Sequence, residues 1–164
     1  MLKKKRLAQY VIAQGLSSDE LDEVILCCDV LEFKDGDPII KEHSINSSLY
    51  ILEEGRVSVQ IEVCREEKES MEEIAILDSG DVFGEIAFLE EWRRSACVMA
   101  VGDVSVLKLD GDRLHWLFER NNHIGYLMMR NLGLVLARRL MDTNYLRKID
   151  IEDGSVCEDP SVHA

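Results

Sequence analysis

The residues best suited to chemistry lie in one short segment of the chain, between Asp81 and Ala96. Gly84 allows the backbone to approach a ligand closely, and Ile86 to Leu89 can form one helical turn whose free N–H groups would point at an anion. Arg94 follows Glu85 by nine residues. That distance is enough for a helical turn and a return loop, so the Arg94 guanidinium can reach the same anion. The segment therefore predicts a phosphate-binding site.

Glu85 cannot hold a phosphate, but its carboxylate can accept a hydrogen bond from a sugar hydroxyl. Together with Arg94 it predicts a receiver for a ribose that carries a phosphodiester, with the 2′-hydroxyl free. A plainer interpretation stays open, in which Glu85 is an exposed residue at an ordinary strand-to-helix turn. Arg94 would then form a surface ion pair with Glu90 or Glu91, worth about 0 to 1 kcal/mol, although Arg93 fits that role better.

The same segment resembles the phosphate-binding cassette of the cyclic nucleotide-binding domain family, in which F-G-E, a small residue and then R-(S/T/A)-A recur. The matching residues here are Phe83, Gly84, Glu85, Ile86 and Ala87, followed by Arg94, Ser95 and Ala96. The Glu-to-Arg spacing is that of the regulatory subunits of cAMP-dependent protein kinase, and the catabolite activator protein is one residue longer. The resemblance implies that these eight residues bind cAMP, with cGMP as the alternative. Family members that favour cGMP often have Thr at the position of Ser95. The serine in this chain therefore favours cAMP.

A shorter resemblance lies near the C-terminus. The run from Ala137 to Leu140, with Thr143 and Asn144 after it, is similar to the part of the long helix at which catabolite activator relatives contact adenine. It implies that Thr143 faces the base and that Asn144 reaches the nucleotide of the other subunit. Taken by themselves, Thr143 and Asn144 fit plain solvent exposure near a helix end equally well.

The chain departs from the family pattern in two places. The family usually has a Gly two or three residues before the cassette Arg, where this chain has the run from Glu90 to Arg93, with more negative charge beside the expected phosphate. The family also often has an E-G-(D/E) turn near His43 to Ile45. The acidic departure suits an alternative function, a degenerate roll that binds no nucleotide and serves as a protein-interaction module.

The elements before the cassette are a short helix and several strands. Ser17, with Glu20 three residues later, predicts a capped helix that runs to about Cys28. Expected strands follow at Ile39–Lys41, Leu49–Leu52 and Val57–Val63, the last with the apolar-polar alternation of a half-buried strand, and the charged stretch Arg65–Glu73 predicts a solvated hairpin loop.

Further strands are expected at Ile74–Leu77, Ser95–Val101 and Val104–Leu109, with Gly102-Asp103 as a break between the last two. Many short strands separated by Gly and Asp turns favour a mainly β sandwich or roll over a βαβ fold. The family resemblance implies a β-roll (a double-stranded β-helix, or jelly roll) of eight strands. Short N-terminal helices would precede it, and a hinge helix and a long C-terminal lid helix would follow.

The C-terminal part of the chain is helical from about Leu114. Ile124–Lys148 carries Met128, Leu132, Leu136, Leu140 and Thr143 at three- and four-residue spacing, which predicts one long helix. Its leucines could be intramolecular core or a dimer seam, and their number favours a homodimer through this helix. Residues 149–164 are acidic without Lys or Arg and are expected to form a disordered tail after a cyclic nucleotide-binding domain at 1–148.

The composition limits the classes of partner and compartment. A chain of 164 residues fits one domain, and 19 basic against 32 acidic residues give a formal charge of −13, which disfavours nucleic acid and anionic membrane surfaces. Five cysteines without CxxC spacing predict free thiols in the cytoplasm. No apolar run is long enough for a membrane span, and four scattered histidines predict no metal site.

These observations predict a cyclic nucleotide sensor rather than an enzyme. It would lack its own DNA-binding or catalytic domain and would signal to an unknown protein partner through movement of the C-terminal helix. Related rolls include metal-dependent cupins, but they need a His cluster that this sequence lacks. The alternative is the protein-interaction module described above.

Overall fold

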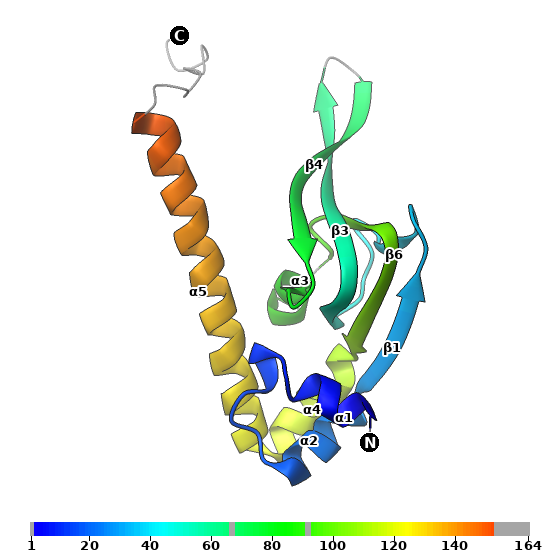
Figure 1. The fold of residues 1–164 in the computed structure, drawn as a ribbon, viewed down its shortest axis with the longest axis vertical. Coiled ribbons are helices and arrows are strands. Elements are labelled where there is room, and N and C mark those ends of the chain that lie inside the picture. The colour runs from blue at the N-terminus through cyan, green and yellow to red at the C-terminus, as the bar shows by residue number, and fades with distance from the viewer. Residues whose placement is uncertain (1, 66–67, 91–92, 153–164) are drawn as a thin grey trace.

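A β-roll with helices at one end is the architecture of the computed structural model, which describes residues 2–65, 68–90 and 93–152 (Figure 1). In chain order the elements are α1 (Leu2–Leu7), the 3-10 helix η1 (Val11–Ala13), α2 (Ser18–Ile25), β1 (Cys28–Phe33), β2 (Pro38–Ile40), β3 (Leu49–Arg65), β4 (Lys68–Asp78), β5 (Val82–Phe83), α3 (Glu85–Glu90), β6 (Cys97–Leu109), α4 (Gly111–Arg120) and α5 (Asn122–Glu152).

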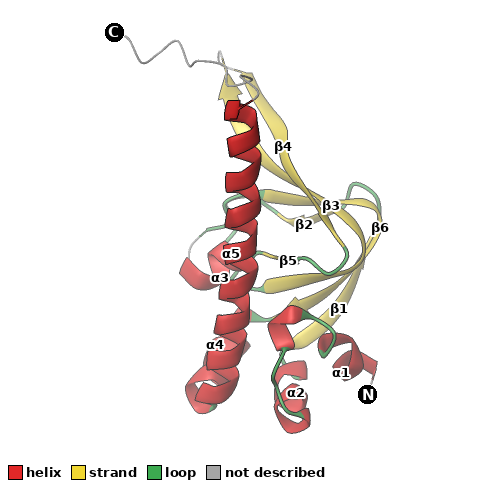
Figure 2. Ribbon diagram, turned by 60° about the vertical axis from the view of Figure 1, so that its left-hand side comes forward, coloured by secondary structure: helices red, strands yellow, loops and turns green. Residues whose placement is uncertain are grey.

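The strands form one six-stranded antiparallel sheet with the order β1-β6-β3-β4. Strand β2 also pairs with β6, and β5 pairs with β3. The two long strands β3 and β6 pair from Leu49 with Leu109 to Gln60 with Cys97, with register shifts around Gly55. Gly55 has φ +91, and a Cβ there would lie 2.5 Å from the carbonyl oxygen of Asp103. Only glycine fits this bulge, where the strand pair bends, and the sheet curls into a roll (Figure 2).

The expected fold class is confirmed, but several strand boundaries are wrong. Gly102-Asp103 does not break the last strand, because β6 runs from Cys97 to Leu109. The expected loop Arg65–Glu73 belongs largely to the β3–β4 hairpin, with Ile61 opposite Glu72 and Val63 opposite Ser70. Charged side chains can face solvent there while the backbone ladder continues. Merging of expected strands leaves six strands in the described residues, instead of the eight that the resemblance implied.

The helix α2 begins where the sequence predicts but ends at Ile25, before the expected end at Cys28. The side chain of Ser17 accepts a hydrogen bond from the Glu20 N–H, and the Glu20 carboxylate accepts one from the Ser17 N–H, which is a complete capping box. The helix α2 ends at Ile25, and Cys28 already starts β1, which pairs with β6. The sequence analysis expected no strand over Cys28–Phe33, although only Cys28 overlaps the expected helix.

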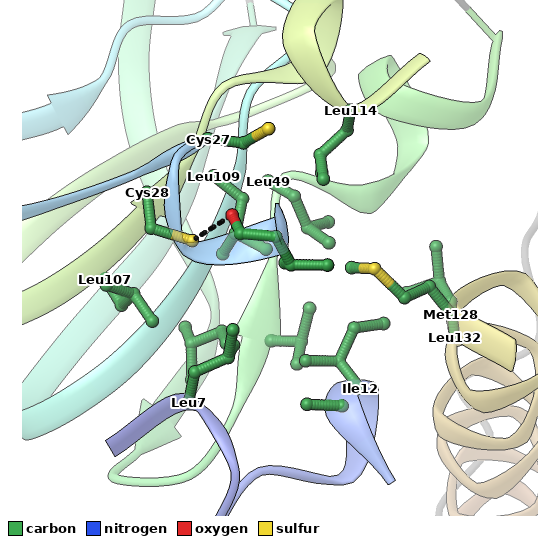
Figure 3. Packing of buried hydrophobic residues seen from close by; sticks show 14 of the residues in the cluster. Leu7, Ile12, Cys27, Cys28, Leu49, Leu107, Leu109, Leu114, Met128 and Leu132 are labelled. Atoms are coloured by element: carbon green, nitrogen blue, oxygen red, sulfur yellow. Dashed lines mark hydrogen bonds between the residues drawn. The ribbon is translucent and has the colours of Figure 1, made fainter. Parts of the chain in front are cut away.

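The larger core cluster lies where the helices cover the end of the roll. Figure 3 shows Leu7 and Ile12 facing Leu107, Met128 and Leu132 across this cluster, and each of them is at most 1% exposed. A second apolar cluster lies inside the roll and is formed mainly by Ile40, Tyr50, Leu52, Val57, Phe83, Val98, Ala100, Val104 and Val106. The first cluster fixes α5 to the roll, and the second supports the strands that carry the cassette.

The long helix α5 rises beside the roll and continues to Glu152, so the helix extends four residues into the expected tail (Figures 1 and 2). Residues 153–164 lie outside the described part of the chain. Leu132 is 1% exposed and belongs to the intramolecular core, which corrects its assignment to a dimer seam. Leu136 is partly buried against the same core, whereas Leu140 is 63% exposed. None of the helices in the described ranges has a stretch long and apolar enough to cross a membrane.

Candidate functional site

The cassette residues line a cavity of about 210 Å³ between the roll, α3 and α5. Its apolar wall comes from Ile40, Val59, Ala75, Leu77 and Val98, and its remaining lining comes from Phe83, Gly84, Glu85, Ile86, Ala87, Arg94, Ser95, Ala96 and Arg139. A mostly apolar cavity with a few converging charged groups is the usual form of a small-molecule site.

Arg94 is the most deeply placed charged residue of this cavity, with 3% of its surface exposed. Its Nη1 donates to the Gly84 carbonyl at 2.9 Å, and its Nη2 donates to Asn46 Oδ1 at 3.0 Å and to the Ser48 carbonyl at 2.6 Å. The Tyr50 ring lies 5.6 Å from the guanidinium carbon and stacks on Phe83. The side chain is therefore held by neutral oxygens and an aromatic face.

The backbone of Arg94 is fixed as well, by hydrogen bonds to His43 and Ser44 on the neighbouring loop. Burial lowers the pKa of the Arg94 guanidinium, and Tyr50 and Glu85 partly oppose this effect. Within the described residues, its buried Nε has no hydrogen-bond partner. A buried cation with a spare donor and no bonded carboxylate is the arrangement that an anionic ligand would complete.

Gly84 is required by its backbone and by the close approach of its neighbours. Its φ is +80, a region that side chains disfavour, and a Cβ there would lie 2.6 Å from Arg94 Nη1 and 3.1 Å from the Ser48 carbonyl oxygen. The glycine expected from the motif therefore serves the packing of Arg94 as well as access to a ligand.

Glu85 opens α3 at the edge of the cavity, with its side chain 13% exposed. Its Oε1 accepts a hydrogen bond at 3.2 Å from Nη1 of Arg139, which reaches down from α5. Nη2 of Arg139 donates to the Val82 carbonyl and lies 3.7 Å from Asp81 Oδ1. The carboxylate expected to receive a sugar hydroxyl is thus paired with a guanidinium from the long helix.

The structure brings eight of the ten expected site residues together around the cavity, namely Phe83, Gly84, Glu85, Ile86, Ala87, Arg94, Ser95 and Ala96. It does not bring Thr143 and Asn144 to the cavity lining. Both are exposed, and the Thr143 hydroxyl donates to the carbonyl of Arg139 in its own helix at 2.9 Å. Arg139, one turn earlier, is the residue of α5 that lines the cavity.

Sequence reasoning missed the apolar wall, and it included Arg139 in the run from Ala137 to Leu140 without assigning it to the site. The alternation along Val57 to Val63 contained a usable signal, because it places Val59 on the buried face of β3. Arg139 lies one helical turn before Thr143 and so shares its side of α5, which was the available signal for choosing it over Arg138.

Glu91 and Trp92, which belong to the acidic departure from the family pattern, lie outside the described residues, and Glu90 is exposed. The expectation of no metal site rested on scattered histidines, but the structure places potential ligand atoms of Glu42, His43 and Glu62 within 4.8 Å of one another. His43 and Glu62 are exposed, and Glu42 Oε2 already accepts from the Glu62 N–H.

Residues 30–121 match the cyclic nucleotide-binding domain family. Among curated proteins, the chain is 30% identical over 145 residues to glutaminase 2 of Bradyrhizobium diazoefficiens, covering 88% of this chain and 22% of that protein. It is 29% identical over 131 residues to the cyclic AMP receptor protein of Thermus thermophilus, covering 79% of this chain and 57% of that protein. This chain therefore spans between about a fifth and somewhat over half of these relatives.

Solved structures show the same fold. The Thermus thermophilus catabolite activator protein superposes with a TM-score of 0.66 at 27% identity, covering 85% of this chain and 62% of that chain. A cyclic nucleotide-binding domain from Methylobacillus flagellatus superposes with a TM-score of 0.78 at 17% identity, covering 90% and 84%. The second likeness concerns the fold alone.

Proposed function

This chain belongs to the cyclic nucleotide-binding domain family, and on that premise we propose that its cavity binds a cyclic nucleotide, specifically cAMP, as a regulatory ligand rather than a substrate. Similarity to a cyclic AMP receptor protein and to a regulatory subunit of cAMP-dependent protein kinase supports cAMP, while equal identity, 29%, to a cGMP-dependent protein kinase keeps cGMP as the alternative. The serine at position 95 supports the same choice.

The observation that carries this proposal is Arg94. A guanidinium that is 3% exposed and bonded only to neutral oxygens within the described residues loses hydration without gaining a bonded counter-charge. A cyclic phosphate beside Gly84 and Ser95 would supply that counter-charge. Arg94 would then contribute charge-assisted hydrogen bonds, which are roughly twice as strong as bonds between neutral groups.

The remaining lining fits the other parts of a nucleotide. Glu85 can accept a hydrogen bond from the ribose 2′-hydroxyl, and the wall of Val59, Ala75 and Leu77 suits a flat base. The formal charge of −13 makes the surface unfavourable for long phosphate polymers, so duplex nucleic acid is an unsuitable partner. The negative surface repels a small ligand with one negative charge less than it repels a nucleic acid, and the buried Arg94 guanidinium attracts that charge.

We assign the output to α5. Thr143 and Asn144 are exposed beyond Arg139, so a base contact from either residue requires the end of α5 to move toward the cavity. That movement would change the exposure of Leu140, Met141 and Tyr145, each more than 60% exposed, and a homodimer or another protein would detect it there. The domain would span residues 1–148 together with the last turn of α5.

The cysteines support a reducing compartment, and we place this function in the cytoplasm. Within the described residues, Cys27, Cys28, Cys64 and Cys97 form no disulfide bond, and Cys64 is exposed. Cys157 lies outside the described residues. Burial raises the pKa of the Cys27 and Cys97 thiols, which keeps them protonated and unreactive.

Titration of cAMP into the wild type and three variants tests the proposal. We expect Arg94→Ala to weaken binding by about 2 to 5 kcal/mol, the range for truncating one partner of a buried charge pair, or roughly thirtyfold to several thousandfold. Arg94→Lys keeps the charge without the planar fork and should recover part of the affinity. Arg93 is exposed, so Arg93→Ala is the matched control and should bind as the wild type does.

Calorimetry gives the affinities, and circular dichroism with thermal melts shows whether each variant is folded. The melts matter because Arg94 also bonds the Ser48 and Gly84 carbonyls, so its loss costs some stability. Full affinity in a folded Arg94→Ala variant would refute the cassette assignment. A folded wild type that binds neither cAMP nor cGMP would favour the alternative function, a protein-interaction module.

A further inference from the structure

A second cluster of ligand-type side chains lies outside the cavity lining, where the loop after β2 meets β3. Glu42 and His43 come from this loop and Glu62 comes from β3, and one ligand atom of each lies within 4.8 Å of the other two. His43 Nε2 is 3.9 Å from Glu42 Oε1. Ligand atoms around one zinc ion lie about 3.3 Å apart, because each is about 2.0 to 2.2 Å from the metal. Rotation of the exposed His43 and Glu62 side chains can reach this separation.

The Glu42 carboxylate is already oriented toward the middle of the cluster. Its Oε2 accepts a hydrogen bond at 3.0 Å from the Glu62 N–H, and its Oε1 is the oxygen near His43. The side chain is 16% exposed, so it is held against the edge of β3. Hydrogen bonds that fix a carboxylate in this way are typical of metal ligands and raise metal affinity.

The charges of the cluster favour a cation. Two carboxylates lie together, and within the part of the chain that the structure describes neither forms an ion pair with Lys or Arg. A protonated His43 supplies one positive charge, whereas a divalent ion supplies two. An imidazole beside two carboxylates suits Zn²⁺ and similar transition-metal ions, because Mg²⁺ and Ca²⁺ prefer sites made of oxygen alone.

The cluster is connected to the cavity through the backbone. The His43 N–H donates to the Arg94 carbonyl at 3.0 Å, and the Arg94 N–H donates to the Ser44 carbonyl at 3.0 Å. The same loop carries Asn46, whose Oδ1 accepts from the Arg94 guanidinium. An ion that joins this loop to β3 would therefore fix the segment that holds Arg94 in place.

We propose that Glu42, His43 and Glu62 form a binding site for a divalent transition-metal ion, with Zn²⁺ as the best fit and water completing its coordination, and that the ion ties the loop after β2 to β3. The inference does not depend on cyclic nucleotide binding. The sequence predicted no metal site because its histidines are scattered, whereas this ligand set needs one histidine and a contact between residues 20 positions apart.

Calorimetric titration of ZnCl₂, MnCl₂ and MgCl₂ into the full chain, with no nucleotide present, tests the site. We expect Zn²⁺ to bind more tightly than Mn²⁺ and Mg²⁺ not to bind measurably. His43→Ala and Glu62→Gln should each weaken Zn²⁺ binding by at least about tenfold, the lower end of the loss for even an outer partner of a metal site. Glu42→Gln can still accept the Glu62 N–H but loses the charged ligand, so it should weaken binding similarly.

Glu54→Gln is the matched control, because Glu54 is exposed on β3 and the change removes the same charge outside the cluster. It should bind Zn²⁺ as the wild type does, and so should Cys64→Ser, which removes the exposed thiol two residues after Glu62. Full Zn²⁺ affinity in folded His43→Ala and Glu62→Gln variants overturns the proposal, as does its loss in Cys64→Ser. Mg²⁺ binding as tight as that of Zn²⁺ also overturns it, since general attraction by charge would then explain both.

Amide hydrogen exchange tests whether the ion ties the loop to β3. Zn²⁺ should slow exchange at the His43 and Arg94 amides, which are bonded between the loop and its neighbour, and should leave exchange on β1 unchanged. The slowing should disappear in His43→Ala. Zn²⁺ binding without slower exchange at these amides would contradict the tie, while failure to bind cAMP would bear on the proposed function alone.

Discussion

The two halves of α5 have the same secondary structure and opposite surroundings. In the first half, one face is buried: Ile124, Met128 and Leu132 are at most 1% exposed and belong to the core at the end of the roll, and Asn131 is buried beside them. In the second half, Leu140, Met141 and Tyr145 are between 63% and 69% exposed. Arg139 lies between them and contacts the cavity.

The difference divides α5 into two parts. We call residues 122–136, which pack on the core, the base, and residues 140–145, whose side chains are exposed, the arm. Buried helical segments open only with the whole domain, whereas exposed segments with few tertiary contacts open at low cost. A helix is stiff over this length, so a small rotation at its base displaces its far end by several ångströms. Under the proposed function, a ligand that changes the contacts of Arg139 would act near the boundary between base and arm and would move the arm without disturbing the core.

The largest effect should come from the same substitution made in each half. Leu132→Ala removes a side chain that is 1% exposed and should lower the free energy of unfolding by about 2 to 5 kcal/mol, because it loses apolar burial and leaves a cavity. Leu140→Ala, at 63% exposure, should change it by at most about 0.5 kcal/mol. Urea denaturation measures both.

The same experiment should be run at two protein concentrations, because a dimer through α5 would make the stability depend on concentration. A loss from Leu140→Ala that grows with concentration would reveal an interface rather than a core contact. Equal losses from both variants at low concentration would contradict the division of α5 into base and arm.

A smaller effect is expected from the polar contact that fixes the base. The buried Nδ2 of Asn131 donates to the carbonyls of Ile12 at 3.2 Å and Gln14 at 2.8 Å, which attaches the η1 segment to α5. Asn131→Ala removes both donors, and leaving the buried Ile12 carbonyl unsatisfied should cost about 1 to 3 kcal/mol.

Asn144 is exposed on the arm of the same helix, so Asn144→Ala is the matched control and should stay within about 0.5 kcal/mol of the wild type. Amide hydrogen exchange adds a local measurement, since Asn131→Ala should speed exchange around η1 more than on β6. Uniform exchange in that variant would show that the contact supports the whole domain and not the base of α5.

The cassette could be predicted from the sequence because its parts are close in the chain. Gly84, Glu85 and Arg94 lie within one turn and one return loop, so their spacing nearly determines their meeting point. Thr143 and Asn144 could not be placed in this way, since their distance from the cavity depends on the direction in which α5 leaves the core.

The same limit explains the errors along the strands and in the helix. The spacing of Leu132, Leu136 and Leu140 defines one face of a helix, but it does not show where the roll stops covering that face. Gly102-Asp103 has the composition of a turn, yet β6 continues through it because the residues on both sides pair with β3, Val101 with Arg56 and Ser105 with Glu54. Contacts between elements that are distant in the sequence decided both cases.

The smallest effect on monomer stability, with a large effect on mass, is expected on the arm itself. If a second copy covers the exposed face, Leu140→Glu combined with Met141→Glu should convert a dimer to a monomer, because two carboxylates would be buried against apolar side chains. The monomer should lose at most about 0.5 kcal/mol of unfolding free energy, since Leu140 and Met141 are 63% and 69% exposed.

Light scattering measures the mass of each variant. Met71→Glu combined with Ile74→Glu, on exposed positions of β4, is the control, because it adds the same charge elsewhere. A dimer that survives in the α5 variant would place the interface elsewhere and leave the arm for another partner, whereas dissociation in both variants would point to net charge rather than to α5.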